Sequence, residues 1–136
     1  RLVATRITGA SPVVDGALDD SAWTAAEPAT GFVQFEPEPG APATERTEAR
    51  ILYDDEAVYV GVRLFDSRPD SVTGHLFRRD EEGYSDWVYV ALDTRRDRRT
   101  AFTFGVNPRG VKWDAFLYDD TRVDRSWDAI WDAASR

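Results

Sequence analysis

The sequence predicts an all-β protein, a sandwich of two antiparallel sheets with little helix. Many short runs rich in β-branched and aromatic residues are separated by turn signals every ~8–12 residues, which is typical of a sandwich. No segment longer than one or two turns has the periodicity of a helix. The 136 residues suit one domain, and we expect residues 1–136 to form it.

The clearest strands span residues 48–53 and 57–65 and are joined by Asp54, Asp55 and Glu56. Aspartate carboxylates accept hydrogen bonds from nearby backbone N–H groups, so this link favours a turn. Side chains alternate between the two faces of a strand. Val58, Val60, Val62 and Leu64 therefore share one face of the second strand, and we expect that face to lie in the core.

The segments before this hairpin predict shorter elements. We expect residues 2–7 to form a short strand and Asp19 or Asp20 to cap one helical turn that carries Ala22 and Trp23 inward. Residues 31–35 form a strand. Residues 36–44 contain three prolines and a glycine, which favours an extended surface loop.

After the hairpin, strands alternate with charged or polar turns. The strongest strand spans residues 87–92, with Val88, Val90 and Leu92 on its core face. The other expected elements are a weaker strand at 72–77, a charged loop at 78–83, a charged tip at 95–99, strands at 100–106 and 111–118, a polar loop at 119–125, and the start of a last strand at 127–132.

Composition excludes several classes of function. The chain has 17 basic and 25 acidic residues and a net charge of −8, which disfavours binding to nucleic acid or to anionic membranes. No apolar run approaches the ~18 residues of a membrane-spanning helix. The absence of cysteine excludes disulfides and thiolate sites.

Catalysis has no motif to support it. The single histidine is His75, and no G-x-S-x-G, H-E-x-x-H or P-loop pattern occurs. Paired carboxylates of a glycosidase depend on a three-dimensional separation that the sequence does not define. We therefore expect no enzyme activity and predict no catalytic residue.

Aromatic residues near the strand at 87–92 are the best candidates for a binding surface. If Val88, Val90 and Leu92 face the core, Trp87 and Tyr89 face the other way. An exposed row of such rings, with Tyr84 close by, would be a binding surface, because sugar rings stack on aromatic faces. The alternative is that each ring fills the core or covers an edge of a sheet.

Acidic loops raise the alternative of a calcium site. Ca²⁺ takes six to eight oxygen ligands from carboxylates, carbonyls and water, whereas a single acidic loop is more often a solvated turn. Asp66 and Asp86 are the metal candidates, since each lies at a strand boundary. There a carboxylate either binds a cation or accepts hydrogen bonds from backbone N–H groups.

Several motifs, taken in order, resemble a known family. VVDGALDDSAW, EARILYDDEAVYVGVRLFDS, SDWVYVALDT and FTFGVNP are similar to the family 9 carbohydrate-binding module. The sequence is more closely similar to the family-9-like domain at the N-terminus of larger bacterial cell-envelope proteins, in which a long C-terminal region rich in predicted β-strands follows. That match adds RRDEEGYSD, DRRTAFTFGVNPRGVKWD and DRSWDAIW and covers nearly the whole chain.

The resemblance implies an immunoglobulin-like sandwich, bound calcium and an extracytoplasmic location (periplasm, outer-membrane-associated or secreted). It also implies further strands after residue 136, so we expect a fragment of a longer chain. Sugar-binding members hold a sugar's reducing end between two tryptophans, with Glu, Arg and Asn as hydrogen-bonding groups. In this sequence the first tryptophan and these three polar residues fall on Tyr84 (or Gly83), Tyr89, Gly105 and Asn107, and the second tryptophan lies beyond Arg136.

Two functions follow as expectations. The first is a non-catalytic carbohydrate-binding-like module with ligand-binding residues Tyr84, Trp87, Tyr89 and Asn107 and structural Ca²⁺ at Asp66 and Asp86. The second is an interaction or assembly domain that docks on its own C-terminal region or on neighbouring subunits. The proline-bearing loop 36–44 and an unfinished sheet motivate the second, because open sheet edges recruit strands from partners.

Overall fold

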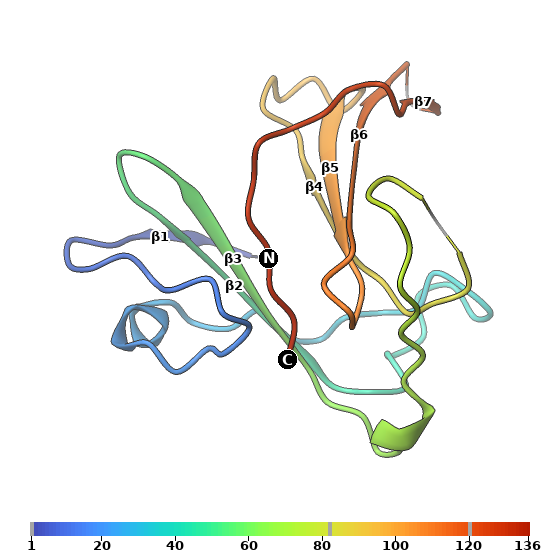
Figure 1. The fold of residues 1–136 in the computed structure, drawn as a ribbon. Helices are drawn as coiled ribbons and strands as arrows, with labels where there is room; N and C mark the ends of the chain where they lie inside the picture. The colour runs from blue at the N-terminus through green and yellow to red at the C-terminus, as the bar shows by residue number, and fades with distance from the viewer. Residues whose placement is uncertain (1, 82, 120) are drawn as a thin grey trace. The chain divides into compact units, whose positions relative to one another are not determined.

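The computed structural model describes residues 2–81, 83–119 and 121–136, and its regular structure is almost entirely β (Figure 1). The strands in these ranges are β1 (Ala4–Arg6), β2 (Thr47–Tyr53), β3 (Val58–Leu64), β4 (Val88–Leu92), β5 (Ala101–Val106), β6 (Lys112–Tyr118) and β7 (Arg122–Asp124). Two short 3₁₀ turns, η1 (Ser21–Ala25) and η2 (Pro69–Ser71), are the helical segments that accompany them. The predicted all-β class with little helix is confirmed. Within the described ranges no helix is long and apolar enough to cross a membrane.

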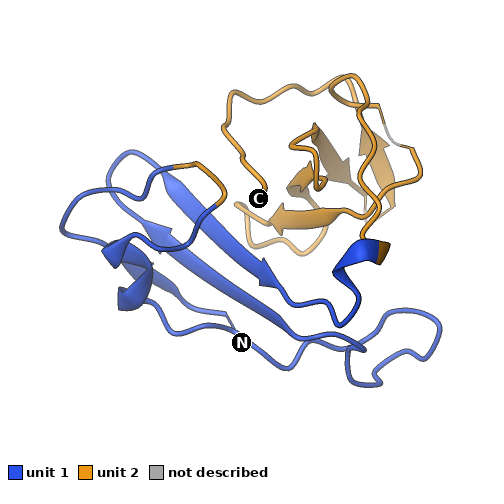
Figure 2. Cartoon of the chain, turned by 60° about the horizontal axis from the view of Figure 1, so that its bottom comes forward, with its two compact units in different colours: residues 1–13, 17–70 blue, residues 14–16, 71–136 orange. Residues whose placement is uncertain are grey.

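The strands form two sheets, with the orders β1-β2-β3 and β4-β5-β6-β7. All pairs are antiparallel except β1 with β2, which run parallel with Ala4 opposite Ile51. The chain divides into two compact units that carry one sheet each (Figure 2). Unit 1 comprises residues 1–13 and 17–70, and unit 2 comprises residues 14–16 and 71–136.

The predicted hairpin is present in unit 1, where β2 and β3 pair from Thr47 opposite Leu64 to Tyr53 opposite Val58. The Asp54 carboxylate organises the turn by accepting hydrogen bonds from the N–H groups of Glu56 (2.9 Å) and Ala57 (2.8 Å). It also accepts hydrogen bonds from the hydroxyls of Ser11 and Tyr59. The bond from Glu56 N–H, followed by those from Ser11 and Ala57, lowers the pKa of Asp54 from 3.8 to about 2.

This carboxylate should make the stability of the protein depend on pH in acid. Because the pKa of Asp54 is depressed in the folded state, its stabilisation is complete above the unfolded pKa of ~3.9. It is lost as the pH falls through about 2. Urea unfolding of the wild type and of Asp54→Asn should give a difference in unfolding free energy that is constant above about pH 5 and shrinks below it. A difference that stays constant down to pH ~2 would contradict this role of Asp54.

The core of unit 1 is built around Trp23, which η1 carries inward as predicted. The predicted side-chain cap is wrong, because Asp20 makes no side-chain capping hydrogen bond and its carboxylate accepts the Val13 N–H instead. Trp23 packs with Ile7, Ala26 and Leu52, and Leu18, Ala22 and Tyr59 lie against this cluster. Gly61 of β3 makes room for the indole, because a Cβ at this position would lie 2.9 Å from the Trp23 ring. The face of the hairpin that carries Leu52, Tyr59 and Gly61 is therefore the packed face.

The predicted core face of β3 is thus wrong. Val58, Val60 and Leu64 are exposed, and Val62 is half-buried. Both faces of this strand carry apolar or aromatic residues, so alternation alone does not decide between them. The choice is made by Gly61, whose missing side chain lets the Trp23 ring approach the backbone.

Two predicted strands do not form a ladder. Residues 31–35 contribute only an isolated bridge between Val33 and Pro42, after Gly31 at a left-handed φ of +71°. Residues 72–77 are irregular, and the backbone of Thr73 pairs with Asp86: its N–H donates to the Asp86 carboxylate (2.7 Å) and its carbonyl accepts the Asp86 N–H (2.8 Å). The polar loop expected at 119–125 instead contains β7, which pairs with the end of β6.

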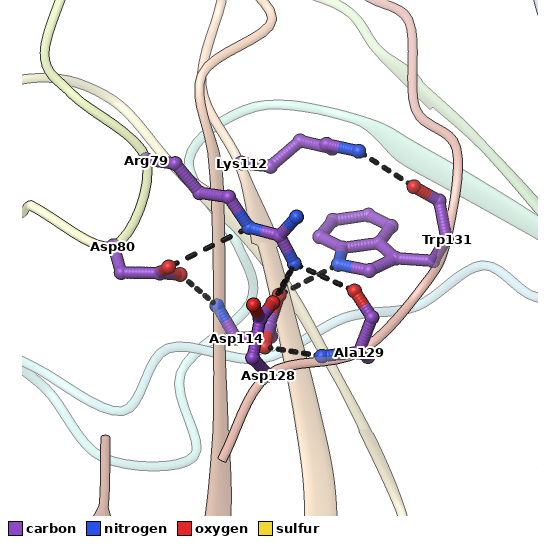
Figure 3. A network of polar contacts seen from close by, with 7 residues as sticks. All are labelled: Arg79, Asp80, Lys112, Asp114, Asp128, Ala129 and Trp131. Atoms are coloured by element: carbon purple, nitrogen blue, oxygen red, sulfur yellow. Dashed lines mark hydrogen bonds and ion pairs between the residues drawn. The ribbon is translucent and has the colours of Figure 1, made fainter. Parts of the chain in front are cut away.

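The last predicted strand, at 127–132, is extended but joins no ladder among the described residues. Trp127, Ala129 and Trp131 are half-buried, whereas Asp128, Ile130 and Asp132 are exposed. Side chains replace the partner strand (Figure 3). The Ala129 N–H donates to Asp114 Oδ1 (3.0 Å), the Ala129 carbonyl accepts from Arg79 (2.6 Å), and the Trp131 carbonyl accepts from Lys112 Nζ (2.6 Å).

Candidate functional site

Unit 2 carries a continuous series of aromatic rings, which we call the aromatic row. Its members are, in spatial order, Tyr84, His75, Phe77, Trp87, Tyr89 and Trp113. The distances between the centroids of neighbouring rings are 6.5, 6.3, 6.5, 5.8 and 5.5 Å. The row therefore joins an irregular segment, the approach to β4, β4 itself and β6.

Alternation along β4 places part of this row at the surface. Val88, Val90 and Leu92 are half-buried, while Tyr89, between them, is 45% exposed. Tyr84 is 84% exposed, and Trp87 is half-buried. The prediction that Tyr89 faces away from the three apolar residues of its strand is confirmed.

Two glycines let rings of the row lie close to the backbone. Gly105 of β5 is opposite Tyr89, and a Cβ at Gly105 would lie 2.5 Å from the Tyr89 ring. A Cβ at Gly83 would lie 2.2 Å from the ring of Phe77. On β6, Trp113 is the other partner of Gly105 and meets the Tyr89 ring edge-on at 89°. The Tyr89 ring is thus supported by a glycine below and an indole beside it.

Buried polar atoms lie on the same face of this sheet. Trp113 and Thr103 share the face of Tyr89, because Gly105 pairs with both Tyr89 and Trp113, and Thr103 is two residues before Gly105. Neither Trp113 Nε1 nor Thr103 Oγ1 has a hydrogen-bond partner among the described residues. The Arg125 guanidinium lies 5.9 Å from the centroid of the Trp113 ring. Two buried polar atoms near the aromatic row therefore lack a partner among the described residues, and Trp113 itself is only 5% exposed.

Asn107, the fourth predicted ligand-binding residue, is buried and occupied within the protein. Its side-chain oxygen accepts the N–H groups of Arg109 and Val111, both at 2.9 Å. Its amide nitrogen donates to the His75 carbonyl (2.7 Å) and to Ser85 Oγ (3.3 Å). The geometry gives Asn107 a structural role, since it shapes the turn before β6 and ties the segment of His75 to that turn.

The two predicted metal ligands cap backbone groups. Asp66 Oδ1 accepts the Arg68 N–H at 2.6 Å, and Asp86 Oδ2 accepts the Thr73 N–H at 2.7 Å. Asp66 belongs to unit 1 and Asp86 to unit 2. In the part of the chain that the structure describes, no group of three or more His, Asp or Glu side chains could hold a metal ion. Each of the two carboxylates thus has a backbone partner in this structure, and calcium at Asp66 and Asp86 stays a prediction from the sequence.

Asp114 of β6, the most buried carboxylate among the described residues, was not anticipated from the sequence (Figure 3). Its Oδ2 accepts hydrogen bonds from Arg79 (2.7 Å) and Trp131 Nε1 (2.8 Å), and Arg79 also pairs with Asp128. Burial by itself would raise the pKa of Asp114, but the bonds from Trp131, Arg79 and Ala129 outweigh it and lower the pKa. The bond to Asp114 in turn raises the pKa of Arg79. This carboxylate is fully engaged and serves to hold the chain at 129–131.

His75, Phe77 and the two supporting glycines were also missed. A regular strand at 72–77 would have given no reason to connect its rings with those of β4. The available signal was the pairing of a glycine with an aromatic residue on the neighbouring strand, Gly105 with Tyr89. A glycine inside a strand marks a close approach by another group.

The structure is therefore an all-β protein whose aromatic row is exposed at Tyr84, His75 and Tyr89, half-buried at Phe77 and Trp87, and buried at Trp113. Comparisons with protein-family models, with curated proteins and with solved structures found no match to this chain. The resemblance to family 9 modules therefore stays a prediction from the sequence motifs.

Proposed function

We propose that the chain is a non-catalytic, carbohydrate-binding-like module of an extracytoplasmic bacterial protein, and that the aromatic row is its ligand-binding surface. One observation carries the proposal. The Tyr89 ring rests against Gly105, contacts Trp87 and Trp113, and remains 45% exposed. An aromatic ring that is held by its neighbours and still partly exposed offers a preformed apolar contact for the ring of a sugar.

The chemistry of the surroundings favours a neutral, hydroxyl-rich ligand. Exposed aromatic rings gathered in one place mark a binding surface more often than rings scattered singly. The net charge of −8 disfavours a polyanionic partner such as nucleic acid. The exposed ring of Tyr84 carries a hydroxyl group that donates and accepts hydrogen bonds, as a polyol requires. The motif resemblance points to the same class of ligand.

Binding should be lost when the rings are removed. We expect Tyr89→Ala to weaken binding to a soluble polysaccharide about tenfold or more, because one stacked ring contributes on the order of 1.4 kcal/mol. Affinity electrophoresis against hydroxyethyl cellulose, xylan, galactomannan, starch and dextran measures the effect, with circular dichroism to verify the fold. Phe35→Ala is the matched control, because Phe35 is an aromatic residue of unit 1 that is 86% exposed and lies outside the row.

A second candidate is the assembly domain, and one feature of unit 1 favours it. Strand β3 is at the edge of its sheet and exposes Val58, Val60 and Leu64. Long apolar edge strands pair readily with other chains. If none of the polysaccharides retards the wild type, while sedimentation velocity shows self-association that grows with concentration, the assembly role replaces the carbohydrate-binding role.

A further inference from the structure

We infer that strand β3 of unit 1 pairs with β3 of a second copy of this chain, in one antiparallel register, and so joins two three-stranded sheets into one. The pairing uses unit 1, whereas the aromatic row lies in unit 2. The inference therefore goes beyond the carbohydrate-binding role, and either can fail without the other.

The first argument is that one whole edge of β3 has no backbone partner. β3 is the last strand of its sheet and pairs only with β2 among the described residues. The Phe65 N–H donates to the Arg46 carbonyl, and the Asp54 N–H donates to the Ala57 carbonyl. Backbone groups of an antiparallel strand alternate between its two edges, so every second residue from 57 to 65 bonds to β2. The residues between them point their N–H and C=O groups to the free edge; they are Val58, Val60, Val62 and Leu64.

The second argument is that this edge lacks the features that keep natural edge strands unpaired, which include short length, proline, lysine and bulges. β3 spans seven residues, whereas the other edge strands, β1, β4 and β7, span three, five and three. Its one charged side chain, Arg63, lies on the face of Gly61 and not among the valines. Val58, Val60 and Leu64 are exposed. The edge is therefore long, apolar and open.

The third argument is that β3 is complementary to itself. In an antiparallel pair, a residue whose backbone groups point outward lies opposite another such residue. A two-fold axis at Gly61 achieves this along the whole strand, because Val58 then lies opposite Leu64 of the second copy, and Val60 lies opposite Val62. A register shifted by two residues in either direction would move one of these four residues past the end of the other strand.

The charges agree with this register and define its length. Arg63 lies opposite Tyr59 of the second copy, so no like charges meet within the ladder. Just beyond the ladder, Glu56 lies opposite Asp66 of the second copy, and like charges directly opposite are destabilising. The ladder therefore ends at Ala57 and Phe65. Joining two copies also raises the strand number of this sheet from three into the usual range of ~4–6.

Sedimentation velocity of the whole chain, at concentrations up to about 1 mM, tests the pairing. We expect a monomer–dimer equilibrium that Val60→Lys weakens about tenfold or more, because a two-fold axis places each substitution in the interface twice. Val33→Lys is the matched control, since Val33 is an exposed valine of unit 1 outside β3, and it should leave dimerisation unchanged. Added salt should strengthen the dimer, because it screens the repulsion between two copies with a net charge of −8 each.

Disulfide cross-linking tests the register, because the chain has no cysteine of its own. In the register stated, residues 60 and 62 of the two copies lie opposite each other with Cα atoms about 5.5 Å apart, within reach of a disulfide. Residue 60 and its own copy lie farther apart, on a diagonal of ~7–8 Å or more. A mixture of Val60→Cys and Val62→Cys, oxidised with copper–phenanthroline, should therefore cross-link faster than either variant alone.

The other outcomes separate this inference from the proposed function. A chain that stays monomeric, or a dimer that Val60→Lys does not weaken, would overturn the inference and leave the carbohydrate-binding role untouched. A monomer whose Val60 amide exchanges slowly would show that another segment covers the edge, which also overturns it. Faster cross-linking of Val60→Cys with itself would exclude the register. A dimer that binds no polysaccharide would keep the inference and remove the proposed function.

Discussion

Replacing Asp114 by alanine should lower the free energy of unfolding by about 3 kcal/mol. Asp114 is fully buried and accepts hydrogen bonds from Arg79, Trp131 Nε1 and Ala129 N–H. Without the carboxylate, an indole N–H and a backbone N–H lose their acceptor inside the protein. Each such donor costs on the order of 1–3 kcal/mol when it is left unsatisfied. The Arg79 side chain is partly exposed, so solvent offsets part of its loss.

The loss of Asp114 should also release the chain at 127–131. Among the described residues, the side chains of Arg79, Lys112 and Asp114 make four hydrogen bonds with Ala129 and Trp131, and Asp114 accepts two of them (Figure 3). Hydrogen exchange at Ala129 should therefore accelerate more than exchange in the β2–β3 hairpin of unit 1.

The matched control uses the second acidic partner of the same arginine. Asp128 pairs with Arg79 at 2.5 Å, yet its side chain is 69% exposed. Exposed ion pairs contribute ~0–1 kcal/mol, so Asp128→Ala should change the unfolding free energy by less than about 1 kcal/mol. Urea unfolding followed by far-UV circular dichroism gives both values. If both substitutions lowered the unfolding free energy equally, the buried hydrogen bonds of Asp114 would not be what stabilises this part of unit 2.

For Asp114, the sequence predicts the strand but not the hydrogen-bond partners. The strand of Asp114 was predicted almost to the residue, since residues 111–118 were expected and β6 spans Lys112–Tyr118. The partners were not visible, because Arg79 and Trp131 are 35 and 17 residues away along the chain.

The candidate site was predicted in part for a similar reason. Alternation along β4 correctly separated Tyr89 from Val88 and Val90, which is a local property of one strand. The extension of the row to His75 and Phe77 depends on contacts between segments. The burial of Asn107 depends on a turn that uses its amide for four internal hydrogen bonds. Neither follows from residue spacing.

The packed face of the β2–β3 hairpin is the clearest case in which the sequence pattern was misleading. Replacing a leucine by alanine on each face of the hairpin tests which face is packed. Leu52 on β2 is fully buried and belongs to the Trp23 cluster, whereas Leu64 on β3 is 59% exposed. Leu52→Ala should lower the unfolding free energy by about 3 kcal/mol, because it removes transfer energy and leaves a cavity. Leu64→Ala should cost less than about 1 kcal/mol, because no cavity forms at an exposed site.

The two variants remove the same atoms from opposite faces of one hairpin. A difference between their unfolding free energies therefore reports packing and not strand propensity. Urea unfolding followed by far-UV circular dichroism measures each change. Gly61→Ala adds an independent check, since its Cβ would press on Leu18 and Trp23 at 2.9 Å and overpacking typically costs ~1–3 kcal/mol. If Leu64→Ala proved the more costly change and Gly61→Ala were neutral, the valine face of β3 would be the core face after all. The packing of Trp23 against Gly61 would then be wrong.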